Sequence, residues 1–254
     1  MARSHPGRLT PAQWLSTWTL LAVAAPQGFA AALDTQPAFG GNLAATTDYI
    51  YRGVSESDGA ALQADLHGET RGGTFAGVWA STRDRSLEPG SRYDFDIYFG
   101  HRFELDSTWS ASLAARSHYF ADGGEPSDDY QELSGAVSWL DRWTVSLSAV
   151  PNAVRYWYYR RTTRSPAWIA DTSGQWLIGR GLFLTAAAGY YRSTGTGPGA
   201  LAATGYAYGN TGVAYVHRGW RLDVGYFLAE TQAQELFPYP IANRHVAGTL
   251  SWHF

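Results

Sequence analysis

The sequence predicts an all-β protein, a single up-and-down antiparallel transmembrane β-barrel of about twelve strands. Three observations lead to this prediction. Apolar and polar residues alternate along most of the chain, short and long connections alternate between the strands, and a segment typical of an export signal precedes them.

The composition of the 254-residue chain excludes several classes of protein. Aromatic residues make up 15% of the chain and charged residues 16%, a mix that disordered proteins lack. The absence of cysteine excludes a disulfide framework, a zinc–thiolate site and a cysteine nucleophile. A formal net charge of -3 gives no reason to expect nucleic acid as a partner.

Residues 1–32 have the three parts of a secretory signal peptide. Arg3 and Arg8 supply a positive start, residues 14–25 form an apolar stretch, and residues 28–32 offer small side chains for cleavage. The apolar stretch is shorter than the roughly 20 residues of a transmembrane helix. We therefore expect residues 1–32 to be a signal peptide and residues 33–254 to form the barrel. The chain would reach the outer membrane of a Gram-negative cell through the periplasm.

The alternation of apolar and polar residues is clearest in residues 93–100. Tyr93, Phe95, Ile97 and Phe99 lie on one face of this segment. Asp94 and Asp96 lie on the other face, because successive strand residues point to opposite faces. About twelve segments have this pattern and the ~9–11 residues that a tilted membrane strand requires. They are residues 42–52, 60–70, 74–82, 92–103, 109–119, 129–139, 143–150, 167–177, 181–191, 206–216, 219–229 and 242–254.

The connections between these strands are alternately short and long. The short ones are residues 71–73, 104–108, 140–142, 178–180 and 217–218. The long ones are residues 53–59, 83–91, 120–128, 151–166, 192–205 and 230–241. An up-and-down barrel has this pattern because tight periplasmic turns alternate with longer outer loops, whereas a soluble sandwich with Greek-key crossings does not require it.

Aromatic residues cluster at the strand ends, as expected for girdles at the two membrane interfaces. Those next to short turns are Trp109, Trp143, Trp220 and Trp252. Those toward the opposite ends are Tyr49, Tyr51, Tyr119, Tyr190 and Tyr226.

Residues 42–58 (NLAATTDYIYRGVSESD) carry a motif that resembles the opening signature of the TorF-type porins, catalogued as the Gcw_chp conserved hypothetical proteins. The signature is a strand ending in Asp-Tyr-x-Tyr/Phe-Arg-Gly-x-Ser. Residues 74–81, 94–100, 129–133 and 205–210 extend the resemblance over most of the chain after the signal peptide, and residues 151–166 depart from it. The resemblance implies an outer-membrane barrel of porin type and names no established substrate.

If the apolar face contacts lipid, the polar face lines the lumen. The lumen-lining candidates are Asp48, Arg52, Asp65, His67, Glu69, Asp94, Asp96, Arg102, Arg116, His118, Glu132, Asp171, Arg221 and Asp223. Their excess of acidic groups predicts a weak preference for cations. The alternative is that these charges pair across the barrel and fill it, since about twelve strands fall between filled eight-stranded barrels and open porins.

Residues 151–166 concentrate arginine and aromatic side chains on the expected outer rim. The candidates for contacts with lipopolysaccharide phosphates are Arg155, Arg160, Arg161 and Arg164, since guanidinium groups bind phosphate in a bidentate manner. A solvated loop, or strand extensions whose aromatic rings pack together, is the alternative.

At the C-terminus, Trp252 and Phe254 are the expected signal for the barrel-insertion machinery.

Catalysis is a weaker interpretation. Ser117 and His118 are adjacent in a strand and face opposite sides, and the spacing of Ser55 or Ser57 with His67 specifies no orienting acid. We expect no catalytic residue and no cofactor. We also expect no metal, because Asp94 and Asp96 share a face without an implied third ligand.

The sequence thus predicts a porin-like channel for passive diffusion of small hydrophilic solutes. The alternatives are an outer-membrane lipid- or lipopolysaccharide-modifying enzyme and a structural or adhesive barrel with a plugged lumen.

Overall fold

The computed structural model describes residues 38–57, 59–83, 91–121, 129–157, 161–195, 202–237 and 240–254. The expected signal peptide, residues 1–32, lies outside them, as does Arg160. In the described part of the chain, no helix has both the length and the apolar character needed to cross a membrane.

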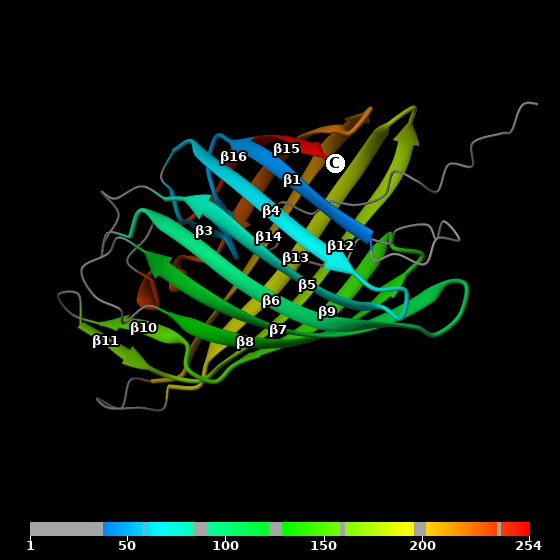
Figure 1. Ribbon diagram of the computed structural model, residues 1–254. Helices are drawn as coiled ribbons and strands as arrows, with labels where there is room; N and C mark the ends of the chain where they lie inside the picture. Colours follow the sequence, from blue (N-terminus) through cyan, green and yellow to red (C-terminus); the bar gives the residue numbers. More distant parts are fainter. Residues whose placement is uncertain are drawn as a thin grey trace, which may run out of the picture.

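Twelve antiparallel strands in the described residues form one closed barrel (Figure 1). Its strands are β1 (Ala38–Thr46), β4 (Ala61–Glu69), β5 (Thr74–Thr82), β6 (Tyr93–Glu104), β7 (Trp109–Ala121), β8 (Tyr130–Trp139), β9 (Trp143–Val150), β12 (Ala167–Gly179), β13 (Leu182–Ser193), β14 (Thr204–His217), β15 (Trp220–Ala229) and β16 (His245–His253). Each strand pairs with the next one of the barrel along the chain, so the predicted up-and-down topology is confirmed.

The first and last strands close the barrel. Asn42 of β1 lies opposite His253 of β16, and Gly41 and Phe254 exchange two backbone hydrogen bonds of 3.0 and 3.1 Å. Both strands therefore have a neighbour on each side, and the sheet keeps no open edge. Such closure is what allows a sheet to pair its backbone groups within hydrocarbon.

The two faces of the barrel have opposite polarity. Phe95, Ile97 and Phe99 of β6 expose 36–63% of their surface, whereas Asp94 and Asp96 of the same strand expose 3% and 1%. The apolar residues therefore face outward and the acidic residues face the interior, as the period of two predicts.

The predicted tryptophan girdle lies along the rim with the short turns. Trp109 is the cross-strand partner of Trp139, which is also the partner of Trp143, and Trp220 is the partner of Trp252. The four predicted tryptophans expose 39–50% of their surface. On the opposite side of the apolar band, Tyr119, Tyr190 and Tyr226 are exposed as well.

The prediction is wrong for the segment after the first strand. We expected residues 42–52 to form a strand, with Tyr49 and Tyr51 in the outer girdle. Instead, β1 ends at Thr46, and the chain forms the short hairpin of β2 (Ile50–Tyr51) and β3 (Val54–Ser55). Tyr49 is 6% exposed, so it does not belong to an interfacial girdle.

The turn of this hairpin explains the Arg-Gly pair of the sequence motif. Arg52 and Gly53 have φ angles of 50° and 80° and connect the paired residues Tyr51 and Val54. Two positive φ angles are typical of the type I′ turn of a two-residue hairpin, which favours glycine at its second position.

Two further elements lie in the long connections. The hairpin of β10 (Val154–Trp157) and β11 (Arg161–Arg164) occupies the expected loop 151–166 and lies beyond one end of the barrel (Figure 1). The 3-10 helix η2 (Thr231–Glu235) lies between β15 and β16.

An arginine on the outer face tests whether that face contacts lipid. Leu147 of β9 is 65% exposed, and Leu105 in the turn between β6 and β7 is 60% exposed. We expect Leu147→Arg to lower the free energy of unfolding in lipid vesicles by about 2–4 kcal/mol, and Leu105→Arg by no more than about 1 kcal/mol, because the cost of arginine depends on its depth in the bilayer. Urea titration of both variants measures this difference, and equal losses would contradict a lipid-facing band.

Candidate functional site

The interior of the barrel is crossed by the segment that follows β1. We call residues 49–57, which contain β2 and β3, the lumen hairpin. The Tyr49 hydroxyl donates a hydrogen bond of 2.9 Å to Asp94 on β6, and the Arg52 carbonyl accepts one of 3.0 Å from Tyr206 on β14. β6 and β14 are six positions apart in the circuit of twelve strands, so the hairpin reaches opposite walls.

An ion pair fixes the tip of the lumen hairpin to the wall. The Arg52 guanidinium donates hydrogen bonds of 3.0 and 2.7 Å to the two carboxylate oxygens of Glu132 on β8. The two side chains are 4% and 5% exposed. Removing either partner would leave a buried charge without its counterion, so the loss of one partner would destabilise the inward position of the hairpin.

The base of the hairpin is held by Asp48. Its Oδ1 accepts hydrogen bonds of 2.6 Å from Ser55 and 3.2 Å from Ser57, and its Oδ2 lies 3.0 Å from His245 Nε2.

Burial, together with the neighbouring Asp94 carboxylate, raises the pKa of Tyr49 well above its usual range, so the Tyr49 hydroxyl stays protonated and can donate its hydrogen bond to Asp94. Each end of the hairpin is thus bound by specific polar contacts.

The turn also packs closely against the wall. A Cβ atom at Gly53 would lie 2.7 Å from Cβ of Ala229 and 2.8 Å from Cβ of Tyr208. Only glycine therefore fits both the φ angle of this position and its distance from β14 and β15.

The lumen-lining candidates divide into buried and partly buried side chains. The buried ones are Asp48, Arg52, Asp65, Asp94, Asp96, His118, Glu132, Asp171, Arg221 and Asp223. The partly buried ones are His67, Glu69, Arg102 and Arg116. Asp48 and Arg52 reach the interior from the segment after β1 and not, as expected, from a barrel strand.

Many of the interior charges are paired, which is the arrangement that we considered as the alternative to free lumen charges. Arg221 donates hydrogen bonds of 2.8 and 2.7 Å to Asp223, and Arg102 binds Glu104 and Asp141 at the short-turn rim. These cations have their charge compensated locally.

Three other interior carboxylates accept hydrogen bonds from tyrosine hydroxyl groups. Tyr49 donates to Asp94 at 2.9 Å, Tyr98 to Asp65 at 2.8 Å, and Tyr208 to Asp171 at 2.5 Å. A hydroxyl group is a neutral donor, so these contacts orient the carboxylates without cancelling their charge.

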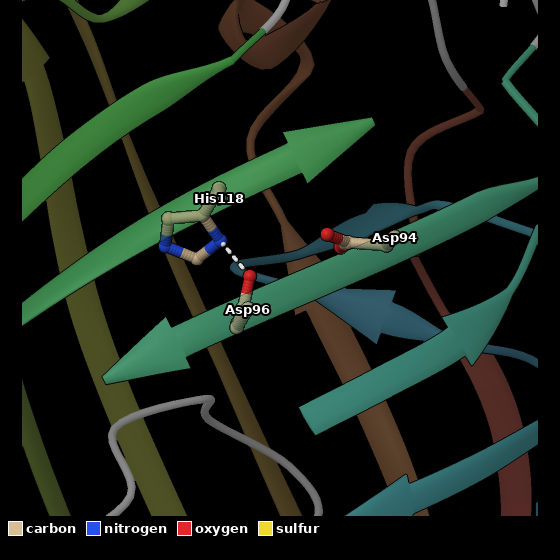
Figure 2. Close-up of side chains that lie close together, drawn as sticks. All are labelled: Asp94, Asp96 and His118. Carbon is tan, nitrogen blue, oxygen red and sulfur yellow. Dashed lines mark ion pairs between the residues drawn. The ribbon is translucent and has the colours of Figure 1, made fainter. Parts of the chain in front are cut away.

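Two of the acidic residues lie beside a histidine that the sequence did not associate with them (Figure 2). Asp94, Asp96 and His118 are buried, and one potential ligand atom from each lies within 4.8 Å of the others. The register places His118 of β7 directly opposite Asp96 of β6. The signal that could have revealed this is the turn length between the two strands, because it sets which residues face each other.

A pocket lies beside the lumen hairpin. Its lining includes Tyr51, Phe120, Tyr130, Tyr206 and Phe237. Aromatic rings therefore line this pocket next to Arg52.

The expected lipopolysaccharide contacts are placed only in part. Arg155 is buried, and its guanidinium donates hydrogen bonds to the Ala202 carbonyl and to Thr204, so its expected exposure on the outer rim is wrong. Arg164 donates to the carbonyls of Asp129 and Asn152. Arg160 and the side chain of Arg161 lie outside the described residues.

The remaining candidates are the C-terminal aromatic residues and the serine and histidine residues considered for catalysis. Trp252 and Phe254 are 39% and 54% exposed, with ring centroids 5.0 Å apart. His67 is paired with Asp65 at 2.5 Å, while Ser55 and Ser57 are bound to Asp48. The two serines that we weighed as catalytic candidates thus share the Asp48 carboxylate, while His67 contacts a different one, Asp65.

Solved structures of porins have the same fold. The NanC porin matches with a TM-score of 0.52 and 10% identity, over 85% of this chain and 98% of that one. The KdgM porin matches with a TM-score of 0.50 and 10% identity over the same shares. A second KdgM structure, described as a complex with disordered oligogalacturonate, matches with a TM-score of 0.51 and 9% identity, over 85% of this chain and 98% of that one. At these identities the likeness concerns the fold, which is that of outer-membrane porins.

No curated protein matches the sequence. Residues 30–235, which include the lumen hairpin and eleven of the twelve barrel strands, match a family model described as a bacterial protein of unknown function. The chain therefore belongs to the Gcw_chp family.

Proposed function

We propose that this protein is an outer-membrane channel for the passive diffusion of small hydrophilic solutes, with its bore narrowed by the lumen hairpin. The observation that carries the proposal is the closed barrel with an apolar outer face and a charged interior. A channel requires this distribution, because solutes pass along the polar face while the apolar face contacts lipid. The proposal agrees with the TorF-type porins that the motif at residues 42–58 resembles.

The proposal includes a weak preference for cations. The lumen-lining candidates contribute eight carboxylates and four guanidinium groups. Asp65, Asp94 and Asp171 accept hydrogen bonds from tyrosine hydroxyl groups, which are neutral donors and supply no compensating positive charge. Fixed negative charge along a narrow passage attracts cations and repels anions. This interior therefore favours a solute different from the anion named in the KdgM complex.

The route to the membrane is part of the same proposal. Residues 1–32 would direct export, and Trp252 and Phe254 would be recognised by the insertion machinery in the periplasm. Arg160, Arg161 and Arg164 of the segment 151–166 would contact lipopolysaccharide phosphates. We favour a channel over a lipid-modifying enzyme because the interior polar residues described above pair with one another and not as nucleophile and base.

Single-channel recording of refolded protein tests the channel and the role of the lumen hairpin. We expect steady conductance from the wild-type protein and a several-fold larger conductance from Gly53→Val, because the new side chain would collide with Tyr208 and Ala229 and displace the hairpin. Gly72→Val is the matched control, since a Cβ there meets only Thr70 Oγ1 at 3.9 Å. Both variants must keep the heat-modifiable migration of a folded barrel.

Two outcomes would contradict this proposal. Folded wild-type protein that forms no channels would indicate a plugged barrel, and lipid-hydrolysis and adhesion assays would then test the alternatives. Equal conductance of wild-type protein and Gly53→Val would show that the hairpin does not set the bore.

The reversal potential in a salt gradient tests the proposed selectivity. We expect the double variant Asp65→Asn/Asp171→Asn to lose most of the cation preference, because it removes two interior charges while keeping side chains that accept the tyrosine hydrogen bonds. Asp106→Asn makes the same chemical change in the exposed turn between β6 and β7 and should leave the reversal potential nearly unchanged. A wild-type channel that prefers anions would refute this part of the proposal.

A further inference from the structure

The cluster of Asp94, Asp96 and His118 has a geometry that charge pairing alone does not explain. Asp94 and Asp96 are two residues apart on the inner face of β6, and His118 lies opposite Asp96 on β7. Their exposed fractions are 3%, 1% and 2%. Figure 2 shows the Asp94 carboxylate directed toward the pair formed by the other two side chains.

Each carboxylate in the cluster has one oxygen held from outside it. Asp94 Oδ2 accepts the hydrogen bond of Tyr49, and Asp96 Oδ2 accepts one of 2.9 Å from Arg116 Nη1. These contacts fix the two carboxylates and leave the other oxygen of each, Oδ1, directed into the cluster. Outer groups that orient ligands in this way are usual around metal sites.

The inner atoms of the cluster lack hydrogen bonds. Within the described residues, Asp94 Oδ1, Asp96 Oδ1 and His118 Nε2 are buried and have no hydrogen-bond partner. Asp96 Oδ1 lies 2.7 Å from His118 Nδ1, and His118 Nε2 lies 4.0 Å from Glu132. Buried polar atoms without hydrogen bonds are rare because desolvation is costly, so Asp94 Oδ1 and His118 Nε2 indicate a missing partner.

A cation gives Asp94 Oδ1 the partner that it lacks and can also be bound by Asp96 Oδ1, which contacts His118. The ligand atoms lie within 4.8 Å of one another, and small side-chain rotations bring them to the ~2.0–2.2 Å that separate zinc from its nitrogen and oxygen ligands. Magnesium and calcium prefer sites made only of oxygen atoms. The imidazole of His118 therefore favours a first-row transition ion.

We propose that Asp94, Asp96 and His118 bind a divalent first-row transition-metal ion, such as Zn²⁺, on the lumen wall beneath the lumen hairpin. Two carboxylates and a neutral imidazole supply three protein ligands, and water completes the coordination. This site does not depend on the channel proposal, because an ion can bind in a plugged barrel as well as in an open one.

Zinc binding to the full barrel in detergent, freed of metal with a chelator, tests the proposal. Isothermal titration with Zn²⁺ should give about one ion per chain for the wild-type protein. We expect Asp94→Asn and His118→Gln each to weaken zinc binding at least 10-fold. Removing a residue that only orients a metal ligand already weakens binding by about 10-fold or more, and these variants remove the ligands themselves. Each variant must first show the heat-modifiable migration and β-sheet spectrum of the folded protein.

The control variant is Asp65→Asn/His67→Gln. It removes another interior aspartate–histidine pair, with atoms 2.5 Å apart, on β4 and outside the proposed site. This variant should bind zinc as the wild-type protein does. Unchanged binding in Asp94→Asn and His118→Gln, or loss of binding only in the control, would overturn the assignment.

Cobalt supplies a measurement that does not depend on the folding of any variant. Co²⁺ bound by two carboxylates and an imidazole in the wild-type protein should give visible absorption bands that Zn²⁺ displaces at one equivalent. Wild-type protein that shows neither zinc binding nor these bands would refute the site, whether or not the barrel conducts ions.

Discussion

The architecture depends on the pairing between β1 and β16, because this pairing converts a twelve-stranded sheet into a barrel without edges. Backbone groups inside a bilayer have no water to bind, so an open edge would be costly along the whole length of a strand. Closure also divides the side chains into two environments. Positions with one parity contact lipid and must be apolar, and positions with the other parity face a protected interior in which charge is tolerated.

The lumen hairpin depends on this protected interior. Arg52 can be buried there because Glu132 meets both arms of its guanidinium, and Gly53 can approach β14 and β15 because it has no side chain. Tyr49 completes the attachment by its hydrogen bond to Asp94 on β6, which lies across the barrel from β14. The residues of the Asp-Tyr-x-Tyr-Arg-Gly-x-Ser motif therefore share one task, which is to hold a short turn across the barrel.

The strands and their faces could be predicted from the sequence because they follow local periodicity, and the alternation at residues 93–100 suffices to orient Asp94 and Asp96. The inward turn could not. Residues 47–52 continue the alternation of β1, while the contacts that redirect them join residues 45, 80 and 154 positions apart. The third member of the cluster, His118, could not be predicted for a related reason. His118 meets Asp96 only through the register of β6 and β7, which composition and periodicity leave open.

The choice of donor decides which interior carboxylates can attract a cation. Arginine cancels the charge that it orients, as in the pairs of Arg52 with Glu132 and Arg221 with Asp223. Tyrosine orients a carboxylate and leaves its charge in place. Since a narrow passage of low polarizability strengthens the field of each uncompensated charge, an ionised carboxylate bound by tyrosine contributes more to the potential inside the barrel than one paired with arginine. Asp94 combines this residual charge with a free oxygen beside His118, and it is there that the lumen offers a cation both attraction and ligands.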